Sequence, residues 1–320
     1  MKYVGFVTLL FLALTAGNPD TSFETLWYTG RRNAKDQNNL NQSFFSSLEN
    51  YQVNAKHVTE EDYTWVARVV HSRTAMLPHI CTAVCIDEGI FITAARCIYS
   101  LIVSYTTVIY LQSHLPAIAF VLPSKMTKQL HDDIGFIVVN QSTFQGVWPV
   151  VDLFGGSNRT DNTFKWFAKL ESTFTNVKVV GYAMEKGIHR ITSAYRQYDL
   201  TELSVVVGMD ICSKILTMHR RIEGFLVPCY HSCNVHEFVQ KTSKCSSYHG
   251  VEGGAVFDKK TNKLMGLATW GAYFSNYELP VGFSVVNSVN FFKDYTCARK
   301  IRNADHLSVE PGYYQRLCVA

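Results

Sequence analysis

CTAVCIDEGIFITAARC, residues 81–97, contains three of the chain's nine cysteines and a short apolar run, GIFITAA, that is rich in β-formers. Similar runs lie on both sides of it and are separated by turn-forming residues: TWVARVV (64–70), TTVIYL (106–111), IGFIVV (134–139), VKVVGY (177–182), LSVVV (203–207), KLMGLATW (263–270) and VGFSVV (281–286). Runs of this length, composition and spacing are typical of all-β domains. The sequence therefore predicts an all-β fold, as a sandwich or as barrels, between about residues 52 and 290.

The two ends of the chain differ from this central region. Residues 1–17, MKYVGFVTLLFLALTAG, contain one lysine, an apolar run and then small residues, which is the pattern of a secretory signal peptide cleaved near Ala16 or Gly17. Residues 18–51 are polar and contain no cysteine, and they predict an N-terminal extension. A helix is expected at about 287–300, and residues 299–320 are expected to form a tail. We therefore expect a secreted, extracellular protein.

The composition argues against several classes of function. The net charge is only +4 and no run of basic residues stands out, so nucleic-acid binding has no support. The apolar stretch 101–122 is interrupted by polar residues and a proline, and its tyrosines, valines and threonines favour buried strands over a membrane span. CYHSCNVH, residues 229–236, has the residue types of a metal cluster, but disulfides are the better expectation in a secreted β-protein. We expect no metal and no other cofactor.

The segment 81–97 resembles the chymotrypsin/trypsin family of serine proteases. In that family a strand ending in Thr-Ala-Ala leads to the catalytic histidine and then to a cysteine, with another cysteine sixteen residues earlier; here the residue before the second cysteine is Arg96. DDIGFIVV, residues 132–139, resembles the segment of the catalytic aspartate and places Asp133 there. GVEGGAVF, residues 250–257, resembles the Gly-Asp-Ser-Gly-Gly-Pro loop, with Glu252 at the nucleophilic serine.

Three further segments follow in the family's order. YTWVARV (63–69) resembles the opening strand of the first barrel, VVGYA (179–183) the start of the second, and LATWG (267–271) the Ser-Trp-Gly strand beside the substrate. The resemblance implies a chymotrypsin-like double six-stranded antiparallel β-barrel with a C-terminal helix. The trypsin-like domain is expected over 52–298, with barrel 1 at about 52–165, barrel 2 at about 166–290 and a cleft between them.

The resemblance also implies that the family's chemistry is lost. In the family, the serine attacks, the histidine takes its proton and the aspartate orients the histidine. Arg96 cannot take that proton, because a guanidinium stays protonated and has no acceptor. Glu252 thus lacks a base, and Asp133 alone cannot cleave a peptide bond. Since the fold places the three side chains together, we expect Arg96 to lie between Asp133 and Glu252 in a partly buried ion-pair cluster.

The positions for activation and substrate binding depart from the family as well. In relatives, cleavage after a basic residue frees an N-terminus that pairs with the aspartate before the serine. Here the cut site reads Tyr51-Gln52 and the aspartate is Val251, so both ends of that ion pair are missing. Val281 stands where a glycine keeps the specificity pocket open, and we expect a narrowed, vestigial pocket. The other positions expected at the pocket and oxyanion hole are Ser246, Gly250, Thr269, Trp270 and Gly271.

Cysteines and sequons suggest covalent features. The resemblance pairs Cys81 with Cys97, and Cys212 with Cys229. We further expect pairs of Cys233 with Cys245 and of Cys297 with Cys318, which leave Cys85 as a buried thiol on an apolar strand. The acceptor sequons for N-linked glycans lie at Asn41, Asn140 and Asn158.

These features predict a secreted, inactive serine protease homologue that binds extracellular proteins as a cofactor or regulator. Such homologues act in extracellular protease cascades, in haemolymph immunity and in seminal fluid, so active proteases are among the expected partners. Residues 18–51 lack the six cysteines of a clip domain, which argues against one immune subtype. Two alternatives are an active serine-type endopeptidase with a rearranged site, using Ser246 or Ser247 with His249, and a decoy that captures substrates or inhibitors. Val281 argues against the open pocket that a decoy needs.

Overall fold

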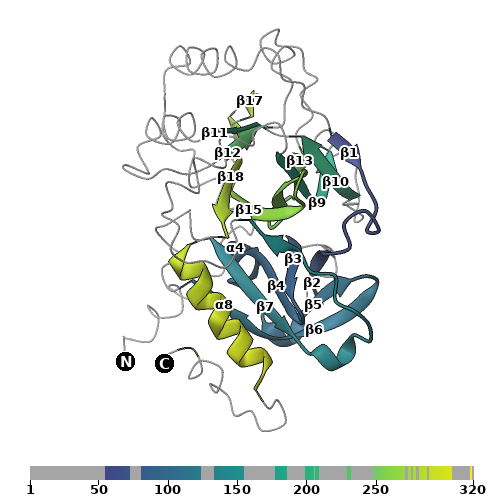
Figure 1. Cartoon of the computed structure of the whole chain (residues 1–320), viewed down its shortest axis with the longest axis vertical. Coiled ribbons are helices and arrows are strands. Elements are labelled where there is room, and N and C mark those ends of the chain that lie inside the picture. Colours follow the sequence, from purple (N-terminus) through teal and green to yellow (C-terminus); the bar gives the residue numbers. More distant parts are fainter. Residues whose placement is uncertain are drawn as a thin grey trace, which may run out of the picture.

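The chain forms two packed β-structures and one long helix (Figure 1). The computed structural model describes residues 55–72, 81–123, 133–154, 177–185, 199–204, 206–208, 229–231, 248–249, 251–270, 273–274, 277–278, 281–286, 288–304 and 318. The expected signal peptide and N-terminal extension lie outside these residues. The predicted all-β class and the C-terminal helix are confirmed.

Six antiparallel strands close into the first barrel, in the order β2-β3-β4-β7-β6-β5. These strands are β2 (Val66–His71), β3 (Cys81–Asp87), β4 (Ile90–Ala94), β5 (Thr106–Tyr110), β6 (Ser113–Val121) and β7 (Ile134–Val139). All residues of β4 and β7 are buried, as are all of β3 except its last, which explains why these strands are mostly apolar in sequence. Short helical turns connect or follow the strands: α4 (Ala95–Ile98), η1 (Val103–Tyr105) and η3 (Gln141–Thr143).

The apolar stretch 101–122 is part of this barrel. It contains η1, β5 and β6, and the side chains of β5 alternate between buried and partly exposed positions. This alternation is the pattern of strands with one face on a core. Within the described part of the chain, no helix combines the length and apolar character needed to cross a bilayer.

The second β-structure follows the pairing path β1-β10-β9-β14-β15-β18-β12-β11. Its strands are β1 (Ala55–His57), β8 (Asp152–Leu153), β9 (Val177–Glu185), β10 (Asp199–Ser204), β11 (Val206–Gly208), β12 (Cys229–His231), β13 (Tyr248–His249), β14 (Ala255–Asp258), β15 (Lys263–Trp270) and β18 (Val281–Val285). The path from β10 ends at β11, and these two strands are consecutive in the chain with only residue 205 between them. This sheet stands at the place of the predicted second barrel, although its described pairings do not close it. A separate hairpin joins β16 (Tyr273–Phe274) to β17 (Tyr277–Glu278).

The predicted extent of barrel 1, about 52–165, is too wide. Strand β1 pairs with β10, and β8 pairs in parallel with β15, so both belong to the second sheet. The segment after β1 follows it there, since Val58 N donates to Leu200 O at 2.9 Å and Tyr63 hydrogen-bonds Glu202 of β10. Lys259 strengthens this attachment by donating to the Tyr63 hydroxyl at 2.7 Å. The strands of barrel 1 therefore lie between residues 66 and 139. The position of a short strand in the sequence does not determine which sheet it joins.

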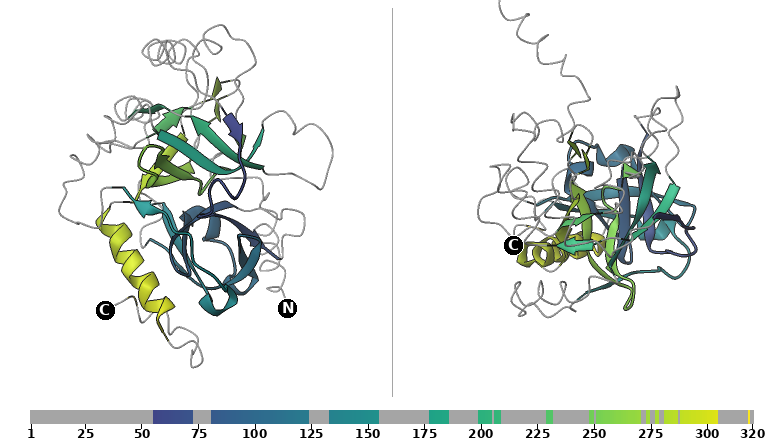
Figure 2. Two further views of the ribbon diagram at one scale, coloured as in Figure 1. Left: turned by 45° about the vertical axis from the view of Figure 1, so that its right-hand side comes forward. Right: turned by 90° about the horizontal axis from the view of Figure 1, so that it is seen from above.

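The C-terminal helix α8 (Val289–Arg302) lies along the first barrel (Figures 1 and 2). Ser288 caps it by accepting from Phe291 N at 3.0 Å. Phe291 packs on Phe136 of β7, with ring centroids 5.3 Å apart. At its other end Arg302 Nη1 lies 3.0 Å from Oδ1 of Asp87, the last residue of β3. The helix ends two residues later than predicted, so the tail begins after Arg302.

The cysteines in the described residues agree with the expected arrangement. Cys81 and Cys97 form a disulfide, and a second disulfide joins Cys297 of α8 to Cys318. Cys85 is free and fully buried, and burial raises the pKa of its thiol to about 12. Cys229 lies in β12, whereas Cys212, Cys233 and Cys245 lie outside the described residues, so the two other pairings remain predictions.

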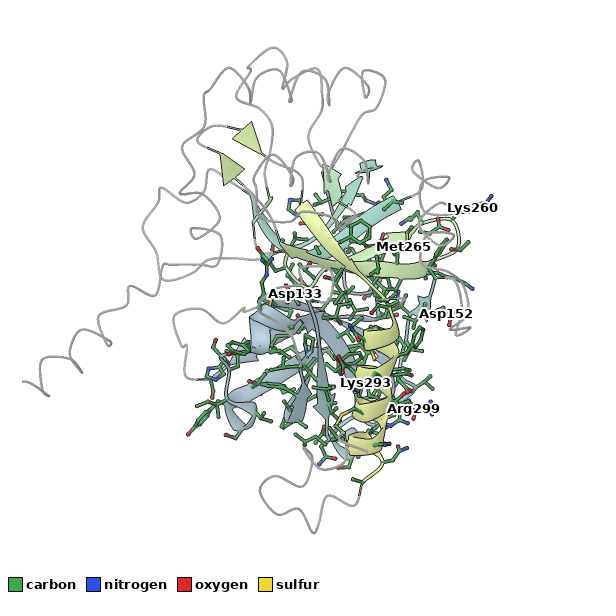
Figure 3. The ribbon with its side chains drawn as sticks, turned by 90° about the vertical axis from the view of Figure 1, so that its left-hand side faces the viewer. Asp133, Asp152, Lys260, Met265, Lys293 and Arg299 are labelled. Carbon is green, nitrogen blue, oxygen red and sulfur yellow. A yellow bond between two sulfur atoms is a disulfide. The ribbon has the colours of Figure 1, made fainter. Side chains whose placement is uncertain are left out.

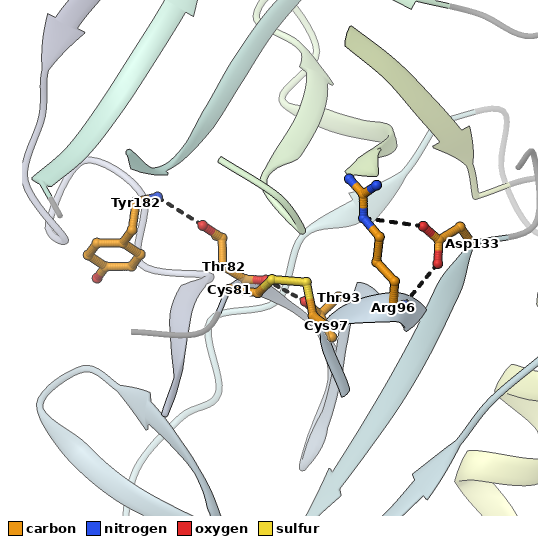
Figure 4. The surroundings of a disulfide bond; sticks show 7 residues. All are labelled: Cys81, Thr82, Thr93, Arg96, Cys97, Asp133 and Tyr182. Atoms are coloured by element: carbon orange, nitrogen blue, oxygen red, sulfur yellow. Dashed lines mark hydrogen bonds and ion pairs between the residues drawn. A yellow bond between two sulfur atoms is a disulfide. The ribbon is translucent and has the colours of Figure 1, made fainter. Parts of the chain in front are cut away.

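Thr82 of β3 joins the two barrels (Figure 4). Its backbone N donates to Glu252 O at 2.9 Å, and its hydroxyl accepts from Tyr182 N of β9 at 2.9 Å. Its carbonyl accepts from the Thr93 hydroxyl of β4 at 2.7 Å. Gly253 fits against this carbonyl with φ of +78°, where a Cβ would lie 2.0 Å from Thr82 O. A side chain at residue 253 would therefore separate the barrels.

We predict that Gly253→Ala destabilises the protein strongly. The substitution adds a backbone conformation that alanine disfavours to a clash with Thr82 O, and together these should lower the free energy of unfolding by about 3 kcal/mol or more. Urea unfolding would measure the change. Gly146→Ala is the matched control, because its Cβ would meet only the Phe144 ring at 3.5 Å, and it should change stability by less than about 1 kcal/mol. Equal effects of the two substitutions would contradict the assigned role of Gly253.

Candidate functional site

Arg96 and Asp133 lie together where the two barrels meet (Figure 4). Arg96 is the second residue of α4, directly before Cys97 of the disulfide, and Asp133 directly precedes β7. Arg96 Nε lies 3.7 Å from Asp133 Oδ2, while Arg96 N donates to Asp133 Oδ1 at 3.0 Å. Both side chains are mostly buried, with 18% of Arg96 and 11% of Asp133 exposed. The structure thus brings these two residues together as the resemblance implies.

Asp133 is held mainly by main-chain groups and hydroxyls. Its carbonyl accepts from Ala95 N at 3.2 Å, and its own N donates to Ser284 Oγ of β18 at 3.2 Å. Ser284 Oγ in turn lies 3.2 Å from Thr269 Oγ1 of β15, and both hydroxyl residues are fully buried. Asp133 therefore connects α4 with two strands of the second barrel; Figure 3 shows it at the level where the two β-structures meet.

Burial sets the acidity of this carboxyl group. Loss of hydration raises the pKa of Asp133 to about 6, because a buried carboxylate is poorly solvated. The nearby Arg96 charge and the N–H groups of Arg96 and Ala95 oppose that rise without cancelling it. Asp133 thus changes charge near pH 6, far above the usual range of an aspartate.

Glu252 does not complete the expected ion-pair cluster. Although it is partly buried, its carboxylate has no ion pair with any described residue, and Arg96 pairs only with Asp133. The prediction of Arg96 between two carboxylates is therefore wrong for Glu252. The bond from Thr82 N to Glu252 O and the conformation of Gly253 fix the backbone from which this side chain extends. Burying a second carboxylate beside one guanidinium would also carry a large desolvation cost.

Val251 packs against glycines of the same loop and of β9. It is buried, and its Cγ2 methyl lies close to two glycines. A Cβ atom on Gly181 or on Gly254 would lie 3.1 Å from this methyl group. Gly254 N donates to Val251 O at 2.7 Å, and Gly253 N donates to Ala268 O at 2.7 Å. These contacts hold the loop without a charged partner at residue 251, whereas the family position carries an aspartate.

The structure places only some of the other predicted site residues. Thr269 is buried, with its hydroxyl 3.2 Å from Ser284 Oγ, and its place in the vestigial pocket stays a prediction. Trp270 and Val281 lie in β15 and β18, where their backbones pair with Gly282 and Tyr230. Gln52, Ser246, Gly250 and Gly271 lie outside the described residues, so the narrowed pocket and the altered activation site stay predictions.

Two contributors to the site were missed from the sequence. Ser284 supports Asp133, and Thr82 fixes the Glu252 loop. Each is a single hydroxyl residue inside an otherwise apolar strand, VGFSVV and CTAVCID respectively. A buried hydroxyl needs a hydrogen-bond partner, so a single hydroxyl residue in an apolar strand could have indicated such a contact.

Comparison with known proteins supports the fold. No protein-family model matches the sequence, and no curated protein matches it by sequence. Among solved structures, the VesB protease of Vibrio cholerae is similar with a TM-score of 0.52 and 16% identity, over 79% of this chain and 68% of VesB. The chain has the fold of the chymotrypsin-like serine proteases. The secreted serine protease VesC of Vibrio cholerae is also similar, with a TM-score of 0.52 and 11% identity over 73% of this chain, but the match covers only 46% of VesC.

Within this chymotrypsin-like fold the site offers donors and a buried acid. Arg96 can only donate hydrogen bonds, and Asp133 is occupied by the groups around it. Among the described residues, no group of three or more His, Cys, Asp or Glu side chains is arranged to hold a metal ion. The arrangement can therefore orient a bound carboxylate or carbonyl group, but these residues supply no base next to a hydroxyl or thiol nucleophile.

We predict that Asp133 makes stability depend on pH. The folded chain keeps the Asp133 proton up to about pH 6, whereas the unfolded chain releases it near 3.8. The folded state binds more protons between these values, so the free energy of unfolding should fall as pH rises from 4 through 6, by at most about 3 kcal/mol. Urea unfolding from pH 4 to 7.5 would show this slope. Asp133→Asn should remove this slope, whereas Asp152→Asn, a change at an exposed position, should keep it. The same pH dependence of stability in the unchanged protein and in both variants would contradict the prediction.

Proposed function

We propose that this protein is a secreted, non-catalytic serine protease homologue that binds other extracellular proteins through its cleft. The observation that carries the proposal is the Arg96–Asp133 pair. The aspartate that orients the base in the family here faces a guanidinium, which cannot accept a proton. Glu252 occupies the position of the nucleophile in the same sequence pattern, and no described base adjoins it.

The loop that carries Glu252 supports the same proposal. Val251 is packed beneath it among glycines, so the loop is ordered without the buried ion pair that activation forms in active relatives. A protein that recognises partners through a preformed cleft has no need of proteolytic activation. The signal-peptide pattern of residues 1–17 supports secretion, and VesC, one of the similar structures, is itself described as secreted. An extracellular pathway with active proteases is the setting we propose.

We predict that the protein does not react with a serine-directed phosphonate. Since Arg96 cannot accept a proton at the position of the family's base, the intact mass should stay unchanged under conditions that label trypsin completely. Arg96→His combined with Glu252→Ser restores a histidine beside Asp133 and a serine in the loop. This double variant should label at least about tenfold faster than Glu252→Ser alone. An adduct on the unchanged chain would contradict the proposal and would favour the active endopeptidase, with the modified peptide identifying its serine.

We further predict that partner binding depends on the charge at residue 252. Immobilised protein should retain specific proteins from the fluid into which the producing cells secrete, and quantitative mass spectrometry would identify them. Glu252→Arg should abolish this retention, because it reverses the charge at the position of the family's nucleophile, where the partly buried carboxylate has no ion pair among the described residues. Lys260→Glu, at an exposed turn remote from Asp133, is the control and should retain the same proteins (Figure 3). If Glu252→Arg retained the same proteins as the unchanged chain, the cleft would be excluded as the partner-binding surface.

A further inference from the structure

Strand β7 separates the proposed cleft from a sequon at its other end. Asp133 precedes the strand where the barrels meet, and Asn140 directly follows it. At about 3.3 Å per residue, the strand places these two residues about 20 Å apart. Asn140 begins the sequon Asn140-Gln141-Ser142 and is partly exposed, while Ser142 is exposed. A large group attached to Asn140 would therefore lie far from the Arg96–Asp133 pair.

The hydrogen bonds of Asn140 fix which way its amide points. Its side-chain oxygen Oδ1 accepts from Ser142 N at 3.1 Å and from the Ser142 hydroxyl at 2.8 Å. A backbone N–H can only donate, so the atom facing the turn must be the oxygen. The amide nitrogen Nδ2 then points away from the turn, and no described residue accepts a hydrogen bond from it. Nδ2 is the atom to which an N-linked glycan is attached.

The rest of the turn is rigid without help from Nδ2. Thr143 Oγ1 donates to Asn140 O at 2.6 Å, and Gln141 Nε2 donates to Glu88 O at 3.0 Å. None of these hydrogen bonds uses Nδ2, so a chain that is modified at Nδ2 can adopt the same turn. The loop that follows exposes two apolar side chains, Val147 at 89% and Val150 at 43%. A bulky polar group at the start of this loop would shield such a surface from self-association.

We propose that Asn140 carries an N-linked oligosaccharide on the end of the first barrel that is remote from the cleft. The inference rests on the secretion included in the proposed function. The donor is an oligosaccharide linked to a lipid pyrophosphate in the secretory pathway. Asn140 Nδ2 forms a bond to C1 of the first sugar and loses one proton, while the bond from C1 to the pyrophosphate oxygen breaks and the lipid pyrophosphate leaves.

Site mapping on secreted protein tests this assignment. The full chain would be produced in cultured insect cells, once with its own residues 1–17 and once with an established secretion leader in their place. Glycosidase treatment in ¹⁸O-water followed by peptide mass spectrometry marks each formerly occupied asparagine. The Asn140 peptide should be labelled, and Asn140→Gln and Ser142→Ala should each remove one glycan from the intact mass. Ser142→Thr keeps the sequon and should retain the glycan.

The two leaders keep this inference separate from the proposed function. An unmodified Asn140 peptide in exported protein from either leader would overturn the glycan assignment, whatever the cleft binds. Export and labelling with the substitute leader alone would support the glycan and count against secretion by the chain's own first residues. Because the sequon lies about 20 Å from the cleft, enzymatic removal of the glycan should leave partner retention unchanged.

Discussion

The contact between Thr82 and the 251–254 loop is the constraint on which the rest of the structure depends. One threonine bonds the loop through its N, β9 through its hydroxyl and β4 through its carbonyl. Gly253 makes this possible, since any side chain there would meet Thr82 O. The contact fixes the distance between the two barrels. It thereby also positions the residues that lie where the barrels meet.

The scaffold that positions Asp133 does not depend on the side chain of its neighbour. The hydrogen bond to Oδ1 comes from the main-chain N of Arg96, and Ala95 N and Ser284 Oγ hold the backbone of Asp133. The Arg96 side chain adds a single ion pair at 3.7 Å. Residue 96 can therefore change its chemistry while the barrels, the disulfide and the buried acid stay in place.

Much of this arrangement could be predicted from sequence, because it follows from local signals. Short β-branched runs indicate the all-β class, and the family resemblance carried by the Cys81–Cys97 segment implies that Arg96 lies near Asp133. The backbone position of Glu252 could not be predicted, since it depends on one glycine conformation and on a bond to a strand distant in sequence. Likewise, the pairing of β1 with β10 depends on non-local hydrogen bonds that no local pattern encodes.

The disulfide between Cys297 and Cys318 changes how the chain bears mechanical load. A force applied to Ala320 reaches the helix through the sulfur bridge at Cys297, in the middle of α8, so residues 298–317 are bypassed. Those residues include Arg302, whose bonds to Asp87 and Glu88 hold the helix to the β3–β4 turn. The attachment of the helix to the barrel is thereby mechanically insulated from the terminus. Reduction of the bridge would remove that insulation and let residues 303–317 extend over about 50 Å.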